Sequence, residues 1–98
     1  MIFAKVTGTI VASQKDKNLN GKKLLLCEEV DQNGKGQGSY HVAVDAVKAG
    51  EGSLVLLTYG SAARMTDVTK EAPVDAVVMA IIDSWDVDGV VKYRKSDE

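Results

Sequence analysis

Cysteine and proline are scarce in this chain, which has one of each among its 98 residues. A lone cysteine, Cys27, excludes an internal disulfide and fits a protein of a reducing compartment. Its segment KLLLCEEV is typical of a strand, and its acidic neighbours oppose thiolate formation. We therefore interpret Cys27 as a small core or sheet-face residue and not as a catalytic thiol.

Aromatic residues are also few, and neither sign of charge dominates. They make up 5% of the chain, and the formal net charge is -2. Such a chain has no strongly positive surface to attract phosphates and too few aromatic rings on which nucleotide bases could stack. We therefore expect no nucleic-acid partner. Lys5 interrupts the apolar N-terminal segment, so this segment is unlike a signal peptide. The longest apolar run, residues 76–82, is far shorter than the ~20 residues of a membrane helix. We expect a soluble, cytoplasmic protein with no membrane partner.

Short apolar or alternating segments separated by turn residues run through most of the chain. They predict strands over residues 2–12, 23–30, 40–47, 53–59, 76–82 and 90–94. Asn33-Gly34 and Asp88-Gly89 indicate turns, Gly8 indicates a bend, and Pro73 marks a strand start. The segment GSAARM suits a short helical turn capped by Ser61. We predict an all-β fold in one domain, residues 1–98: a five-stranded OB-like barrel with one short helical turn, and a peripheral C-terminal strand and tail over about residues 88–98.

Catalytic, cofactor-binding and metal-binding patterns are not recognisable, and we expect none of these sites. GSAAR lacks the second glycine of a nucleophile elbow and the lysine of a P-loop. His41 and Cys27 alone make no zinc motif, and spacing neither excludes nor favours a serine–histidine–aspartate set. Asp45, Asp75 and Asp83 stand at strand edges. Paired carboxylates can act as a general acid and a general base. The better interpretation is that these aspartates lie in turns and accept hydrogen bonds from backbone N–H groups.

The stretch LTYGSAAR, residues 57–64, places small residues and one arginine at the end of a strand. The pattern suits a nucleophile, an anion-binding helix start or a contact with another copy of the chain. Small residues let two backbones approach closely, and an arginine beside them can bond to carboxylates or carbonyls of a neighbour. For Arg64 alone, that role and a solvated side chain are equally good interpretations.

Four blocks of the sequence, taken in order, resemble the EutN/CcmL-type vertex proteins of bacterial microcompartment shells. They are AKVTGTIVASQKD, LNGKKLLLCEEVDQNG, VAVDAVKAGEGSLVLLTYGSAAR and APVDAVVMAIID. The resemblance implies an OB-like barrel that forms a cyclic homopentamer without enzymatic activity. Such pentamers cap the five-fold vertices of a polyhedral shell and meet its hexameric proteins in the cytoplasm. The alternative is an OB-type binding module for nucleic acid or a small ligand.

The resemblance also implies a role for the helical turn. It places Gly60, Ser61, Ala62, Ala63 and Arg64 near the five-fold axis and the subunit interface, with Arg64 bonding to the adjacent subunit. A pore lined by Ser61 and Ala62 is weakly polar, whereas five copies of Arg64 favour anions, and both remain open. The family often has serine at position 62 and glycine at position 48. Lysine at position 48 requires a backbone that does not need a positive φ.

Overall fold

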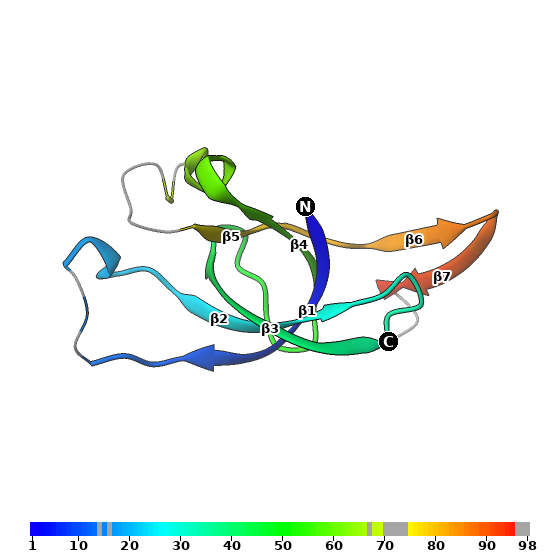
Figure 1. Cartoon of the computed structure of the whole chain (residues 1–98), viewed down its shortest axis with the longest axis horizontal. Helices are drawn as coiled ribbons and strands as arrows, with labels where there is room; N and C mark the ends of the chain where they lie inside the picture. Colours follow the sequence, from blue (N-terminus) through cyan, green and yellow to red (C-terminus); the bar gives the residue numbers. More distant parts are fainter. Residues whose placement is uncertain (14, 16, 67, 70–74, 96–98) are drawn as a thin grey trace.

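A computed structural model describes residues 1–13, 15, 17–66, 68, 69 and 75–95, so the predicted role of Pro73 lies outside the described residues. The described elements follow one another along the chain as strands and short 3-10 turns (Figure 1). They are β1 (Ile2–Ile10), η1 (Lys17–Leu19), β2 (Leu24–Val30), β3 (Gly36–Asp45), β4 (Leu54–Tyr59), η2 (Gly60–Arg64), β5 (Ala76–Ile81), β6 (Ser84–Val87) and β7 (Val90–Arg94). The turn η1 lies between the first two strands, where the sequence analysis predicted no helical turn.

Five strands close into a barrel in the order β1-β2-β3-β5-β4, which confirms the OB-like fold. All neighbours pair antiparallel except β3 and β5, which pair in parallel through two residue pairs only. The predicted bend at Gly8 coincides with a shift of register between β1 and β2, from Val6 opposite Cys27 to Gly8 opposite Leu26. A bulge there bends the strand and lets the barrel close.

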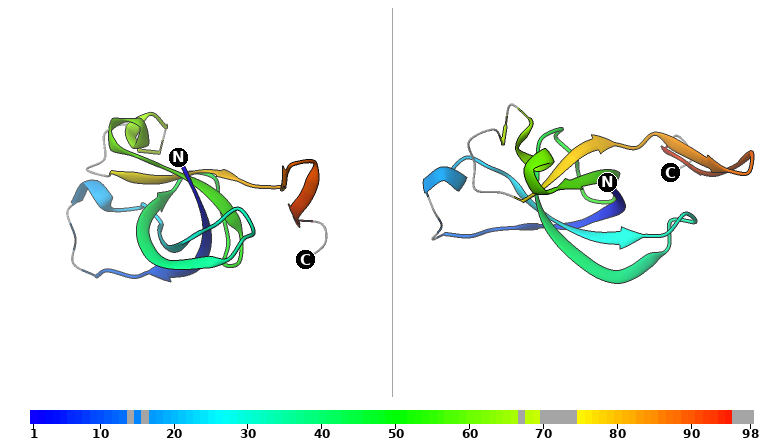
Figure 2. Two further views of the ribbon diagram at one scale, coloured as in Figure 1. Left: turned by 45° about the vertical axis from the view of Figure 1, so that its right-hand side comes forward. Right: turned by 45° about the horizontal axis from the view of Figure 1, so that its top comes forward.

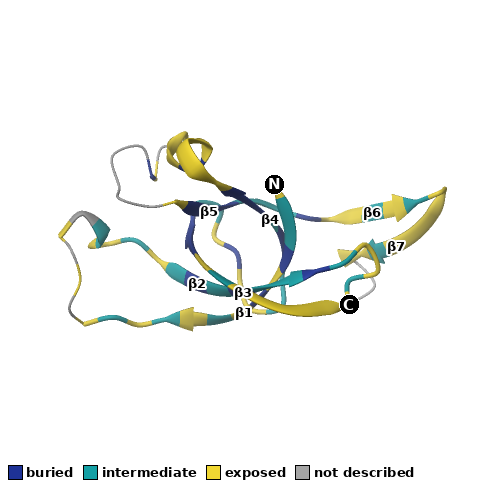
Figure 3. Cartoon of the chain, in the orientation of Figure 1, coloured by how far each residue is buried: buried dark blue, intermediate teal, exposed yellow. Residues whose placement is uncertain are grey.

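Alternate residues of the strands fill the barrel with small and medium-sized apolar side chains. The inner cluster contains Ala4, Val6, Leu25, Cys27, Ala43, Ala49, Val55, Leu57, Ala76 and Val78. Most buried residues lie on the central barrel strands, whereas most of η2 and of the β6–β7 hairpin is exposed or half-buried (Figure 3). Cys27 belongs to this cluster, as the sequence predicted.

A second, smaller cluster lies outside the barrel, beneath η2. It joins Val44 of β3, Val77 of β5 and Ala63 of η2, and Met79 packs against it. Val44 and Val77 are partners in the parallel pairing, and their neighbours Ala43 and Val78 point inward. This explains why β5 is apolar on both faces: one face fills the barrel and the other supports the turn.

The β6–β7 hairpin is a separate two-stranded ribbon that extends away from the barrel along its long axis (Figures 1 and 2). Asp88-Gly89 forms its predicted turn, with both residues at positive φ. The sequence predicted β7 but not its partner β6, a short strand with polar Ser84 and Asp86. What secures β6 is Trp85, whose ring stacks between Phe3 of β1 and Tyr93 of β7 with centroids 5.2 and 4.9 Å away.

The third strand begins at Gly36, four residues earlier than predicted. Its first three residues include Gly36 and Gly38, and glycine disfavours strands, so the sequence signal for a strand is weak there. In the structure the carboxylate of Glu28 on β2 lies over Gly36 and accepts the N–H of Gly38 at 3.0 Å. A Cβ at position 36 would meet that carboxylate, so Gly36 makes room for the Glu28 side chain.

Lys48 adopts φ = 61°, which contradicts our expectation that this position does not need a positive φ. A left-handed backbone costs a residue with a Cβ atom about 1–2 kcal/mol, and substitution by glycine removes this strain. Part of the gain is lost because glycine gives up more conformational entropy on folding. We expect Lys48→Gly to raise the free energy of unfolding by about 0.5–1 kcal/mol. Urea unfolding at a fixed protomer concentration measures this, with Lys48→Ala, which keeps the Cβ, as the control that should gain nothing. Equal gains in both variants would contradict the explanation.

Candidate assembly site

The five residues GSAAR form the 3-10 turn η2, at the point where β4 leaves the barrel. Tyr59, still extended at φ = −128° and ψ = 168°, occupies the N-cap position, and Gly60 turns the chain at φ = 70°. Ser61 lies inside the turn, so our prediction that it caps the turn is wrong. The glycine reverses the chain directly after the strand, and the turn therefore begins before the serine.

The turn is fixed to the barrel by the side chain of Ala63 and by the backbone N–H of Gly60, which donates to the carbonyl oxygen of Asp75 at 2.9 Å. Ala63 is fully buried in the outer cluster, and its carbonyl oxygen accepts the hydroxyl proton of Thr69 at 2.6 Å. Gly60, Ser61, Ala62 and Arg64 are exposed. The small side chain at position 63 is thus needed inside the subunit, and the four others remain available to a second molecule.

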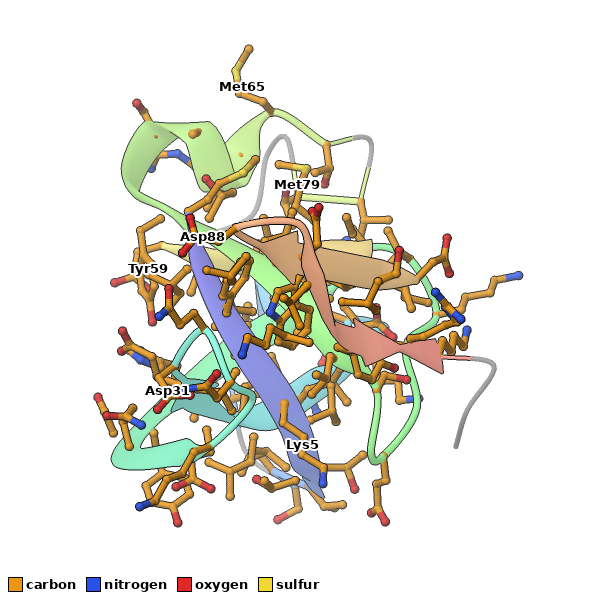
Figure 4. All side chains as sticks on the ribbon, turned by 90° about the vertical axis from the view of Figure 1, so that its right-hand side faces the viewer. Lys5, Asp31, Tyr59, Met65, Met79 and Asp88 are labelled. Atoms are coloured by element: carbon orange, nitrogen blue, oxygen red, sulfur yellow. The ribbon has the colours of Figure 1, made fainter. Side chains whose placement is uncertain are left out.

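The exposed side of η2 carries an unusual combination of a cation and a large apolar side chain. Arg64 forms no ion pair with any residue in the described ranges. Met65, next to it, is 81% exposed and points away from the barrel (Figure 4). An exposed methionine beside a free guanidinium suits a contact surface better than a solvated face.

A hydrogen-bonded chain of three side chains closes the barrel end next to η2, and sequence reasoning missed it. His41 of β3 bonds through Nε2 to Glu29 Oε2 of β2 at 3.2 Å, and through Nδ1 to the hydroxyl of Tyr59 at the end of β4. A carboxylate only accepts, so in neutral His41 the Nε2–H donates to Glu29 and Nδ1 accepts the Tyr59 proton. Strand register alone brings these residues together, because they lie far apart in sequence.

The environment of this barrel end raises two pKa values. Burial, and then the charge of Asp45, raises the pKa of the Cys27 thiol to about 11 from 9.0. Burial, followed by the negative charges of Asp75, Cys27 and Glu29, raises the pKa of the Tyr59 hydroxyl above 10.0. Both groups are therefore uncharged at neutral pH, which excludes a reactive thiolate at Cys27.

Alkaline pH is expected to destabilise the fold through these groups. A group whose pKa is higher in the folded state than in the unfolded state stabilises the folded state at pH values below its unfolded pKa. This contribution to the free energy of unfolding is lost as pH rises through the folded pKa. For Cys27 the loss runs from pH 9 to about pH 11 and amounts to about 3 kcal/mol. Urea unfolding at pH 8 and pH 11 measures it. Cys27→Ala should show a smaller difference between the two pH values, and an unchanged difference would contradict this origin.

The three predicted turn aspartates differ in what their side chains do. Asp45 is buried, and its Oδ1 accepts the N–H of Val47 at 3.0 Å. Asp75 and Asp83 are exposed and bond through their backbone carbonyls, which accept the N–H groups of Gly60 and Lys95. Sequence reasoning also missed Asp31, whose Oδ1 accepts the N–H groups of Asn33 and Lys35 at 2.8 and 3.0 Å. These bonds lower the pKa of Asp31.

The described part of the chain contains neither a metal-ligand cluster nor a serine–histidine–aspartate set. Within it, no cluster of three histidine, cysteine or acidic side chains is placed to hold a metal ion. The hydroxyl bonded to His41 belongs to Tyr59 and not to Ser61, so the described contacts form no serine–histidine–aspartate set. Among the described residues, no helix is long and apolar enough to span a membrane.

Comparison with known proteins places the whole chain beside one family. The model of the family described as "Ethanolamine utilisation protein EutN/carboxysome" matches residues 1–83. The carboxysome shell vertex protein CcmL of Nostoc sp. is 46% identical over 99 residues, which cover 100% of this chain and 98% of that protein.

Solved structures agree with this match. The structure of Gloeobacter violaceus CcmL superposes with a TM-score of 0.94 at 43% identity and covers 99% of this chain and all of the other. GrpN, a pentameric microcompartment shell protein from Rhodospirillum rubrum, has a TM-score of 0.82 at 36% identity, with 89% of this chain and 99% of that chain covered.

Proposed function

This chain belongs to the EutN/CcmL family, and we propose that it is a structural shell protein whose pentamers cap the five-fold vertices of a polyhedral bacterial microcompartment. The observation that carries the proposal is the full-length similarity to shell vertex proteins and to a pentameric shell protein. The fold adds a physical reason: η2 presents exposed residues on a rigid barrel, as a subunit contact requires.

The role of such a pentamer is to close the gap that hexameric shell proteins leave where five facets meet. We propose those hexamers as its partners and the shell in the cytoplasm as its location. A ring of five uses a heterologous interface, in which one patch meets a different patch on the next copy. Closing a vertex of the shell needs neither a chemical reaction nor a cofactor, and we propose that the protein is not an enzyme.

The alternative, an OB-type module for nucleic acid, is disfavoured by where the aromatic rings lie. Single-stranded nucleic acid stacks its bases on exposed rings along a basic groove. Here the Trp85 ring stacks on Phe3 and on Tyr93, and the strands β2 and β3 around the exposed Tyr40 carry no lysine or arginine. Salt-dependent binding of single-stranded DNA would revive the alternative.

Native mass spectrometry of the purified protein tests the proposal. Five copies of the 10.5 kDa chain have a mass of about 52.5 kDa. A pentamer that co-assembles with shell hexamers into closed particles is the expected result. A stable monomer at micromolar concentration would contradict the assembly role.

Arg64→Ala is expected to weaken the ring while leaving the barrel intact. The side chain is exposed and unpaired within the described residues, so its removal costs the monomer little. If its guanidinium bonds to carboxylates or carbonyls of the adjacent subunit, truncation should cost about 1.5–3 kcal/mol per interface. Dilution followed by mass photometry measures the dissociation. Lys22→Ala, in the loop between η1 and β2, is a control for loss of one positive charge.

A further inference from the structure

We propose that Tyr59 is a site of covalent acylation, at which its hydroxyl attacks a small uncharged activated ester while His41 acts as the general base. The proposal goes beyond the assembly role, because it concerns the reactivity of one side chain and not the contacts of the ring. A hydroxyl, an imidazole and a carboxylate bonded in this order form the arrangement that activates a nucleophile in catalytic triads. Here the three groups belong to Tyr59, His41 and Glu29.

The register of the barrel strands holds the three side chains together at one end of the barrel, on its inner side. His41 lies directly opposite Cys27 of the inner cluster, and opposite residues of paired strands point to the same side. Glu29 follows Cys27 by two residues on β2, and Tyr59 follows the buried Leu57 by two residues on β4. Three strands of a closed barrel therefore fix the geometry of the set.

The two ring nitrogens of His41 have different partners, and this sets where the imidazole proton lies. Glu29 Oε2 is 3.2 Å from Nε2 and, as a carboxylate, only accepts, so neutral His41 carries its proton on Nε2. The lone pair of Nδ1 then faces the hydroxyl of Tyr59, which donates to it. This tautomer is the one that can take the proton of an attacking hydroxyl.

The hydroxyl is open to solvent, whereas its base is shielded. Tyr59 is 39% exposed and lies at the outer edge of the molecule in Figure 4, and the His41 side chain is only 19% exposed. Tyr40 is more exposed, at 57%, but its hydroxyl is bonded to no histidine in the described residues. The chain thus contains an accessible tyrosine with a base and a more accessible one without.

The charges at this end of the barrel select the class of reagent. The groups whose charges act on the Tyr59 hydroxyl are Asp75, Cys27 and Glu29, and none of them is a cation. Together with burial they raise the pKa of Tyr59, so the hydroxyl keeps its proton at neutral pH and its reactivity depends on His41. These surroundings repel an anionic acyl donor but not a small uncharged ester.

The acylation step balances without a further reactant. The Tyr59 oxygen forms a bond to the acyl carbon, the bond from that carbon to the leaving alkoxide or phenolate breaks, and the hydroxyl proton passes to His41 Nδ1. Glu29 stabilises the imidazolium until buffer removes its proton. Because Tyr59 is consumed in the step, the reaction is a self-modification and not catalysis.

Acetylation of the purified protein with para-nitrophenyl acetate tests the proposal. At neutral pH and limiting reagent, peptide mass spectrometry should find the acetyl group on Tyr59 well before it is found on Tyr40. In His41→Gln the rate at Tyr59 should fall at least about tenfold, because a general base typically contributes more than that, and the rate at Tyr40 should not change. Tyr40 reacting as fast as Tyr59, or an unchanged rate at Tyr59 in folded His41→Gln, would overturn the proposal.

The pH dependence of the wild-type reaction keeps the proposal testable if His41→Gln misfolds. The rate at Tyr59 should rise from about pH 5 and level off by about pH 8, because only a histidine that has lost its proton can accept one. A tyrosine that reacted only as the phenolate would instead gain about tenfold per pH unit up to its raised pKa, above 10.0. A rate that keeps rising in this way would overturn the role of His41.

Two comparisons test the positioning residue and the reagent class. In Glu29→Gln the midpoint of the rise should move to lower pH, because the imidazolium loses its carboxylate partner, whereas a purely structural role would change the rate alone. An analogue of the ester that carries a carboxylate on its ring should acetylate Tyr59 several-fold more slowly, relative to the rates of both esters with N-acetyltyrosine amide. An unmoved midpoint or a faster anionic ester would contradict these assignments.

Discussion

Leu57→Ala is expected to lower the free energy of unfolding by about 3–5 kcal/mol, more than any other single truncation proposed for this chain. Leu57 is fully buried in the inner cluster and lies opposite both Ile2 of β1 and Val78 of β5. Its loss leaves a cavity between three strands that a closed barrel cannot collapse to fill. Native domains have only about 5–15 kcal/mol to lose, so the barrel should be close to unfolding at 37 °C.

Leu56→Ala supplies the matched control for this prediction. Leu56 is the adjacent residue of the same type on the other face of β4, and it is only half-buried. It should cost less than half as much as Leu57→Ala in urea unfolding at equal protomer concentration. Equal losses at the two positions would contradict the division of β4 into an inner and an outer face.

Trp85→Ala is expected to detach the β6–β7 ribbon and to lower local stability by about 3 kcal/mol. The substitution removes the ring between Phe3 and Tyr93 and the bond from the indole N–H to the Gln32 carbonyl, 2.6 Å long. The Phe3 contact and this bond join the ribbon to the barrel, while the barrel's own pairings do not involve Trp85. The effect should therefore be confined to β6 and β7.

Amide hydrogen exchange resolves this local effect from global unfolding. Amides of β6 and β7 should exchange far faster in Trp85→Ala, while those of β2 and β4 keep their protection. Trp85→Phe keeps an aromatic ring and loses the indole bond, so it should cost only about 1 kcal/mol. Uniform loss of protection through the barrel would contradict a separate ribbon.

Sequence reasoning succeeded where a strand alternates or is apolar throughout and ends at a strong turn signal. The strands around Val6, Cys27, Leu57 and Val78 were predicted within a few residues of their ends. The Asn33-Gly34 and Asp88-Gly89 turns were predicted because glycine tolerates a positive φ. Both kinds of signal are local, so they are present in the sequence itself.

The errors fall where a distant contact overrides the local preference. Gly36 belongs to a strand because Glu28 of another strand lies over it, and β6 exists because Trp85 meets Phe3 of β1. None of these partners lies within reach of a short window of sequence.

The sequence by itself determined the strands, the barrel class and the family, because hydrophobic alternation, turn chemistry and motif order are properties of the chain. Only the tertiary structure decided which side chains of each strand and turn remain exposed to solvent. It buries Ala63, leaves Arg64 exposed, and joins Glu29, His41 and Tyr59. The physical reason is that strand pairing brings together side chains from distant positions, and exposure follows from that pairing.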